Sequence, residues 1–393
     1  MEVKYLMTSA IILYVFTGWL FSKLLGVYFK VKNLGELPGY LLGSLITAIL
    51  FHGLVNYQDL SLVAEISSIL IVFHAGLTSD FMEVLENFKR ALVMSVFAIL
   101  TTFFAVTLIL LSLGFPMETA LLIAILFSNT ATETAALTLE KLGTRLKNLL
   151  VSASFIDDII VLFIATTYFN LLKGLQGSDL ILSLIISITS LLVIMQVGKF
   201  RERFAKFFIK MSKSHESFVD TTITVLAGVV AVFLLFKGSG LIAGYLAGLL
   251  ISIGAAIRDP LLRFKPRIID FTVMLGSLID SVFIPLFLLY VSPLIIRPGI
   301  NLVFVFSVFA GAVLGKFLPY FFFIRHSQQF KEDAIIAGLC MSGRGVLEMV
   351  LVVYGMSLGL LPENIVNSIL VVSVSTSLFA MSSTSLLRKR KVS

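Results

Sequence analysis

The chain has 393 residues, of which 58% are hydrophobic and only 13% are charged. A soluble domain of this length would need far more charged side chains to cover its surface. The net charge of +7 could suggest a nucleic-acid partner, but the basic residues lie mainly between long apolar runs. That distribution indicates membrane topology and no nucleic-acid partner. The composition therefore predicts an all-α polytopic membrane protein.

Apolar runs separated by charged or Gly/Pro-rich breaks predict thirteen transmembrane helices, because each run can cross a hydrocarbon core about 30 Å thick. In chain order they cover residues 7–29, 38–55, 60–78, 91–114, 117–139, 149–172, 178–198, 217–236, 239–257, 277–296, 301–325, 334–357 and 363–386. The first run lacks a basic leader and a small-residue cleavage site. We therefore expect it to be retained as a span and not cleaved as a signal peptide.

The basic residues predict the orientation of these spans. If the N-terminus is outside, 23 of the 30 Lys and Arg residues fall in inner segments and 4 in outer segments. The remaining three are Lys23, Lys316 and Arg344, which lie within spans. The positive-inside rule thus places the N-terminus outside and the C-terminus in the cytoplasm.

Thirteen spans divide into six, one and six. The first group of six spans enters the membrane from outside and the second group enters from inside. The two halves would therefore have opposite topology around a linking helix. This arrangement is the inverted repeat common among secondary transporters.

Two charged residues from separate spans are predicted at the same depth. Asp158 lies nine residues from the inner end of the span over 149–172, and Lys316 lies nine residues from the inner end of the span over 301–325. Both would be roughly 13 Å deep, near the middle of the bilayer. A charge at that depth is costly, so we expect these side chains to share one buried site.

Two further spans contain polar clusters at about this level. The first cluster is Asn129, Thr130, Thr132, Glu133 and Thr134, and the second is Ser342, Gly343, Arg344, Gly345 and Glu348. Such clusters in corresponding spans of two halves predict two broken helices. We expect Glu133, Arg344 and Glu348 to compensate the exposed helix dipoles, with direct contact to an ion as the alternative.

The adjacent Asp157 and Asp158 cannot face one point, because neighbouring residues on a helix project about 100° apart. One can face Lys316, while the other faces a poorly solvated cavity in which it can take up either a proton or a small cation. Competition of this kind, combined with alternating exposure, is sufficient for exchange. A salt bridge that only fixes helix packing is the structural alternative, but it would need one Asp and not two.

With these residues in view, the sequence resembles the monovalent cation/proton antiporters, in particular the two-aspartate branch of NapA-like Na⁺/H⁺ antiporters. The resemblance rests on "SNTATETAALTLEKLG", "SFIDDIIVLFI", "AGAVLGKFLPY" and "MSGRGVLEMVLVVYG", together with weaker matches in "LPGYLLGSLI" and "ILIVFHAGLTSD". It covers essentially the whole chain in order.

The resemblance implies roles for individual residues. Asp158 would bind Na⁺ or a proton, Asp157 would pair with Lys316, and Thr130 and Thr132 would lie where the broken helices cross near the ion. Electrogenic exchange of two protons per Na⁺ is implied, with Asp157 or Lys316 as the second proton carrier. Glu133 departs from the pattern of this branch, in which many members have a small or hydroxyl residue at this position. No cofactor is implied.

The resemblance also implies a domain organisation. Residues 1–90 and 217–298 would form the two halves of a dimerisation unit, and 91–175 and 299–393 the two halves of a core bundle that moves against it. Residues 176–216 would supply the linking helix and a basic cytoplasmic loop. A homodimer in the plasma membrane of a prokaryote, surrounded by lipid, is expected.

Three other functions compete with this interpretation. A K⁺/H⁺ antiporter of the same superfamily is the nearest alternative, and a passive cation channel is a more distant one, since it would need no lysine pair. An intramembrane aspartyl protease needs two carboxyl groups from different helices to converge on one water, which adjacent aspartates cannot do. The sequence therefore predicts a transporter and not an enzyme.

Overall fold

The computed structural model describes residues 2–32, 36–78, 81–130, 142–173, 215–235, 239–255, 264–327 and 329–392. Within these ranges the regular structure is entirely helical. Nine helices there are long and apolar enough to cross a membrane, and shorter apolar helices cover Leu37–Leu50, Met117–Leu126 and Gly240–Ser252. The all-helical membrane class is thus confirmed. The count of thirteen spans stays a prediction, and its seventh member, 178–198, lies outside the described residues.

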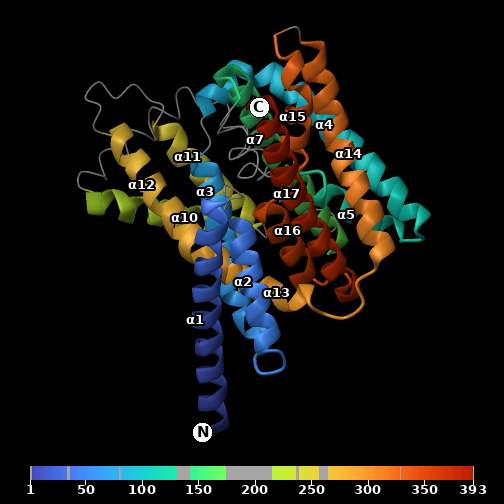
Figure 1. Cartoon of the computed structure of the whole chain (residues 1–393). Coiled ribbons are helices and arrows are strands. Elements are labelled where there is room, and N and C mark those ends of the chain that lie inside the picture. The colour runs from blue at the N-terminus through green and yellow to red at the C-terminus, as the bar shows by residue number, and fades with distance from the viewer. Residues whose placement is uncertain are drawn as a thin grey trace. The chain divides into compact units, whose positions relative to one another are not determined.

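The helices are coloured along the chain in Figure 1. Their bounds are α1 Glu2–Val31, α2 Leu37–Leu50, α3 Ser61–Thr78, α4 Phe81–Ser112, α5 Met117–Leu126, α7 Thr144–Leu172, α10 His215–Leu235, α11 Gly240–Ala255, α12 Phe264–Leu278, α13 Ile284–Ile295, α14 Leu302–His326, α15 Ala334–Met341, α16 Val346–Ser357 and α17 Glu363–Val392.

Two of these helices extend furthest beyond the apolar runs that predicted them. Helix α4 begins at Phe81 and not at residue 91, because the polar segment before the run consists largely of good helix formers. Helix α12 continues through a π-helical segment, Ile279–Phe283, into α13, so the predicted span 277–296 is only the second part of a longer helix. Hydropathy marks the part of a helix that crosses the membrane and not where the helix starts.

The described chain divides into two compact units. The first comprises Met1–Ala64, Asn87–Ala165 and Ile284–Ser393, and the second comprises Glu65–Glu86 and Thr166–Phe283. The predicted grouping into a core bundle and a dimerisation unit remains a prediction.

In the second unit, helices α3, α10, α11 and α12 surround an apolar core that includes Phe73, Leu77, Phe218, Leu226, Ala247, Ile251 and Phe271. Helices α3 and α11 pack closely because Gly248 has no side chain: a Cβ there would lie 2.2 Å from the carbonyl oxygen of Phe73. Small residues at such contacts let membrane helices approach each other.

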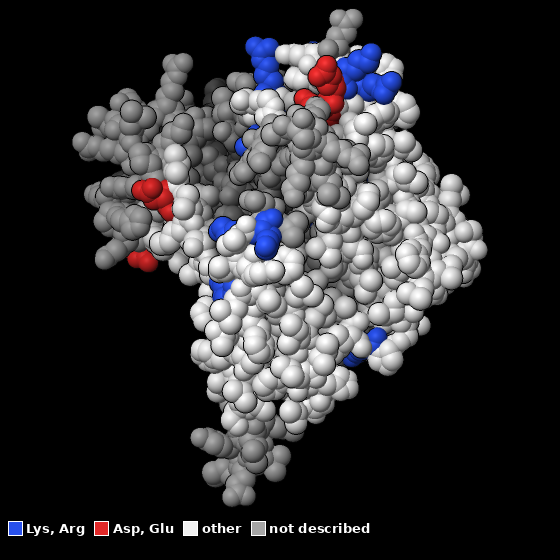
Figure 2. Space-filling model, in the orientation of Figure 1, with Lys and Arg blue, Asp and Glu red and all other residues white. Residues whose placement is uncertain are grey.

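The first unit contains the predicted charged residues. At one edge α2 packs on α1, where a Cβ on Gly39 would lie 2.4 Å from the backbone of α1. Helix α13 is fixed to α1 by the Tyr14 hydroxyl, which donates to the carbonyl oxygen of Leu289 at 2.7 Å. Figure 2 shows that most of the described residues on the visible face are uncharged. The end of α14 and the turn that follows it, by contrast, expose Arg325, Lys331 and Glu332.

A polar cluster closes the turn between α1 and α2. Glu36 accepts a hydrogen bond from Lys30 at 2.5 Å and another from the Tyr40 hydroxyl, and Lys23 donates to that hydroxyl at 2.8 Å. Partial burial alone would raise the pKa of Glu36, but the hydrogen bonds and the lysine charges outweigh it, so the pKa lies below the ordinary value of 4.5.

Candidate functional site: a buried carboxylate pair with a lysine

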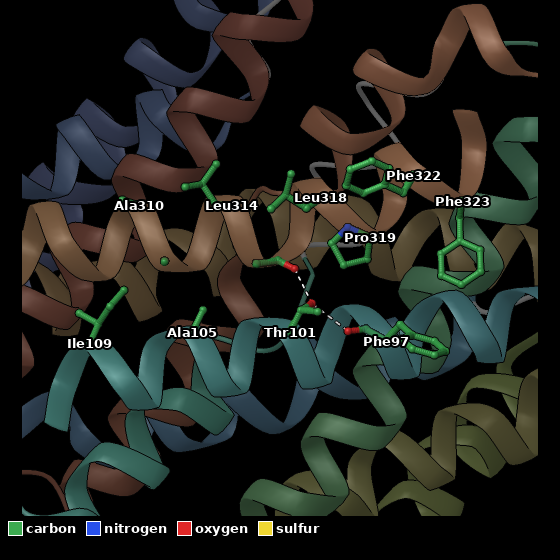
Figure 3. Close-up of a pocket in the computed structure, with 12 residues that line it drawn as sticks. Phe97, Thr101, Ala105, Ile109, Ala310, Leu314, Leu318, Pro319, Phe322 and Phe323 are labelled. Carbon is green, nitrogen blue, oxygen red and sulfur yellow. Dashed lines mark hydrogen bonds between the residues drawn. The ribbon is translucent and has the colours of Figure 1, made fainter. Parts of the chain in front are cut away.

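Helix α14 carries Lys316 and is held against α4 by an unusual contact. Pro319 lies inside α14 and has no N–H to give to the carbonyl oxygen of Gly315, four residues earlier. The Thr101 hydroxyl of α4 has one proton, and its shortest acceptor is that oxygen at 2.6 Å, ahead of the carbonyl oxygen of Phe97 at 2.8 Å, so it supplies the missing hydrogen bond. Figure 3 shows Thr101 between α4 and α14. Gly315 permits this approach, because a Cβ there would lie 2.6 Å from the Cα of Thr102. The residue next to Lys316 is thereby fixed to α4.

Asp157 on α7 receives three donors on a single oxygen. Lys316 Nζ lies 2.5 Å from Asp157 Oδ2, Thr130 Oγ1 lies 2.6 Å from it, and the hydroxyl of Tyr320 lies 3.3 Å from it. The side chains of Asp157 and Lys316 are fully buried. Among the residues that the structure describes, the second oxygen, Oδ1, has no hydrogen-bond partner. One face of this carboxylate is therefore anchored while the other is not.

Asp158 follows directly and is also buried, with 4% of its surface exposed. It projects from α7 about 100° away from Asp157. Its charge acts on Lys316, whose environment also includes the positive charge of Arg344. Two carboxylates and two cations are thus gathered inside the first unit.

The predicted interruption of the span over 334–357 is present. Helix α15 ends at Met341, α16 begins at Val346, and residues 343–345 have no helical conformation. The guanidinium of Arg344 spans this break. It donates to the carbonyl oxygens of Ser342 at 3.0 Å, of Phe127 at 3.0 Å and of Ala312 at 2.9 Å. The first two are last-turn or capping carbonyls of α15 and α5, the kind of group that a helix leaves without an internal partner.

Glu348 lies in the first turn of α16 and is fully buried. It accepts a hydrogen bond from the Ser373 hydroxyl of α17, and its Oε2 lies 3.7 Å from Nε of Arg344. A carboxylate at this end of a helix interacts favourably with the helix dipole.

Helix α5, the described half of the other predicted broken helix, ends at Leu126. Thr130 follows it and contacts Asp157, as given above. Asn129 is equally buried. Thr132 and Glu133 lie outside the described residues. The structure thus brings together Asp157, Asp158, Lys316 and Thr130, with Arg344 and Glu348 at the neighbouring break.

Sequence reasoning missed Tyr320 and Thr101. Tyr320 lies in the aromatic run "PYFFF", where nothing separates it from packing residues, although its spacing of four from Lys316 places both on one helix face. Thr101 gave no signal because its role depends on a proline in a distant helix.

An apolar groove of about 570 Å³ also lies along the α4–α14 contact (Figure 3). Phe97, Ile109, Leu314, Leu318 and Phe322 are among its lining residues, and it contains no charged side chain. It is therefore distinct from the carboxylate site.

A buried carboxylate pair and a lysine, placed beside an interrupted membrane helix, define the class of secondary transporters. The comparison with known sequences identifies the family. A profile described as "Sodium/hydrogen exchanger, transmembrane" matches residues 9–389, and the chain belongs to this family.

Individual relatives agree with this assignment. The chain is 22% identical over 347 residues to the Na(+)/H(+)-K(+) antiporter GerN of Bacillus cereus. The aligned region covers 86% of this chain and 87% of that protein. The fold is similar to that of the sodium proton antiporter MjNhaP1 from Methanocaldococcus jannaschii, with a TM-score of 0.70, 17% identity and 96% of each chain covered. Membership of the monovalent cation/proton antiporter superfamily, as the motifs indicated, is confirmed.

Proposed function

We propose that this protein exchanges Na⁺ for H⁺ across the plasma membrane of a prokaryote by alternating access. The observation that carries the proposal is the fully buried ion pair of Lys316 and Asp157, followed directly by a second buried carboxylate, Asp158. A pair that only stabilised packing would need no second acid, and a lone intramembrane acid is a functional feature by default.

In this proposal Asp158 binds either a proton or Na⁺. A buried carboxylate is stable when neutralised, and a proton or a monovalent cation can each neutralise it. Because both compete for one group, the binding of one promotes the release of the other. Asp157 and Lys316 set the local charge, so that the Na⁺-loaded and protonated forms can both be buried.

Additional ligands for Na⁺ would come from oxygen atoms near Asp158, since a hard cation prefers oxygen. Thr130 and Thr132 are the proposed contributors, together with the unanchored Oδ1 of Asp157. Glu133, Arg344 and Glu348 would compensate the ends of the broken helices. The three carbonyl contacts of Arg344 support this assignment for that residue.

The proposed cycle moves a core bundle, residues 91–175 and 299–393, against a dimerisation unit, residues 1–90 and 217–298. Two copies would associate in the lipid bilayer, with the N-terminus outside and the C-terminus in the cytoplasm. We further propose electrogenic exchange of two protons per Na⁺, the second carried by Asp157 or Lys316.

K⁺/H⁺ exchange is the second candidate. The relative named above is called a Na(+)/H(+)-K(+) antiporter, which favours testing K⁺ at the same site. A passive channel is disfavoured, because a fully buried lysine beside the carboxylates opposes a continuous cation pathway.

The test is proton efflux from proteoliposomes that carry a pH gradient. Na⁺, Li⁺ and K⁺ are added in turn at several pH values, with choline as the control cation. Saturable efflux that depends on at least one alkali cation is expected, and a membrane potential should alter its rate. Flux without saturation, or no cation-dependent efflux at any pH, would contradict the proposal.

A further inference from the structure

We propose that Tyr320 is a positioning residue for Asp157: an uncharged second anchor that holds the carboxylate when a bound cation weakens the pair with Lys316. The inference rests on the proposed function and adds a residue that the sequence motifs do not single out. Tyr320 is completely buried and lies one helical turn after Lys316 on α14. Both side chains therefore approach Asp157 from the same helix face.

The three donors around Asp157 Oδ2 lie at different distances from it, and only two of them are close enough for a full hydrogen bond. A carboxylate oxygen offers about two acceptor sites. Lys316 at 2.5 Å and Thr130 at 2.6 Å occupy both, whereas the Tyr320 hydroxyl stands at 3.3 Å. Hydroxyl-to-oxygen hydrogen bonds are ordinarily about 2.5–3.0 Å long. Tyr320 is thus a donor aimed at an oxygen that has no site left for it.

While Lys316 and Thr130 occupy Asp157 Oδ2, the Tyr320 hydroxyl has a second possible hydrogen-bond acceptor. The side chain of Ser95 on α4 lies close enough to act on the Tyr320 hydroxyl. Ser95 directs its own proton to the carbonyl oxygen of Ala153 at 2.7 Å, so its oxygen is available to accept from the phenol. By rotating about its C–O bond, the Tyr320 hydroxyl can therefore point its proton at the oxygen of Ser95 or at Asp157 Oδ2.

Cation binding changes the balance between these donors. Among the described residues, the charged groups acting on this site are Asp157 and Asp158 on α7, Lys316 on α14, and Arg344 at the break between α15 and α16. Na⁺ at Asp158 adds a positive charge beside the ammonium of Lys316, which is fully buried and cannot be screened by water. The ammonium is repelled, but a neutral hydroxyl is not. An acceptor site on Oδ2 becomes free and Tyr320 fills it.

This arrangement predicts that Tyr320 contributes more to the cation-loaded state than to the empty one. Tyr320→Phe removes only the hydroxyl and keeps the ring that packs inside the first unit. Tyr14→Phe is the matched control, because it also removes one buried hydroxyl hydrogen bond, made at 2.7 Å to Leu289, and Tyr14 has no contact with Asp157 among the interactions of the described residues.

The experiment measures KM and maximal rate for cation-driven proton flux in proteoliposomes, and thermal unfolding in detergent with and without the transported cation. Tyr320→Phe should raise KM roughly ten- to a hundredfold, the effect of losing one hydrogen bond to a charged group. Its maximal rate should change less, and the cation should stabilise it less against unfolding. Tyr14→Phe should keep the wild-type KM. An unchanged KM in Tyr320→Phe, or an equal rise in Tyr14→Phe, would overturn the role of Tyr320.

A second measurement does not depend on removing the hydroxyl. Site-specific 3-fluorotyrosine at position 320 should show a cation-dependent ¹⁹F shift, whereas the same label at position 14 should not. Equal responses at the two positions, or none at 320, would overturn the inference. If the wild-type protein exchanges none of Na⁺, Li⁺ and K⁺, the proposed function fails instead, so the two failures are distinguishable.

Discussion

Lys316→Ala should destabilise the protein strongly, because it leaves Asp157 buried without its ammonium. Removing one partner of a buried ion pair costs about 3–5 kcal/mol. Thr130 already donates to this oxygen in the wild-type protein, so only the Tyr320 hydroxyl can strengthen its contact, and one typical hydrogen bond offsets about 0.5–1.5 kcal/mol. We therefore expect a loss of about 2–4 kcal/mol in the free energy of unfolding.

Thermal unfolding of the purified protein in detergent measures this loss. For a long chain, each 1 kcal/mol corresponds to about 2 °C in Tm, so Lys316→Ala should lower Tm by about 4–8 °C. Replacing both partners, Asp157→Asn with Lys316→Met, should restore most of the stability, because no unpaired charge is left inside. An unchanged Tm in Lys316→Ala, or a double variant less stable than the single one, would refute the reasoning.

Three further variants test other contacts. Thr101→Val leaves the carbonyl oxygen of Gly315 without a donor and should lower the free energy of unfolding by about 1–3 kcal/mol, measured as a lower Tm. A wild-type Tm would contradict the role of Thr101 as the donor to this oxygen. Arg344→Lys should lower the yield of folded protein, because an ammonium group lacks the planar fork with which the guanidinium reaches three carbonyl oxygens. A wild-type yield would contradict this. Glu36→Gln should lower Tm at neutral pH only. Its folded-state pKa is below 4.5, so the stability that it provides is present above that value and is lost as the pH falls further; a Tm difference that persists in acid would contradict this.

Several features of the site follow from local sequence patterns. Asp158 and Lys316 are each nine residues from the inner end of their span, which indicated that they lie at the same depth in the membrane. In the structure the two lie in one buried cluster. The Ser-Gly-Arg-Gly segment indicated a broken helix, because small residues and a charge cannot continue an apolar span without compensation; α15 and α16 are interrupted there. These signals are visible because polar residues are rare in apolar helices.

Other features could not be predicted, because they depend on which helices meet. The Thr101 hydroxyl serves Gly315 only because α4 packs on α14 and Pro319 has removed a backbone donor. Tyr320 is indistinguishable from the phenylalanines around it until its hydroxyl is seen beside Asp157. Hydropathy also could not locate the start of α4, since good helix formers extend it into polar sequence.

The most direct test of the central claim compares Asp158→Asn with wild-type protein in proteoliposomes, by following dissipation of a pH gradient on addition of Na⁺. Asp59→Asn, which removes an exposed carboxylate from the short 3₁₀ helix Tyr57–Leu60, is the matched control. Asp158→Asn should remove cation-driven proton flux while keeping the wild-type elution profile and a sharp unfolding transition. Asp59→Asn should transport normally. Full exchange activity in correctly folded Asp158→Asn would contradict the assignment of Asp158 as the site where Na⁺ and proton compete.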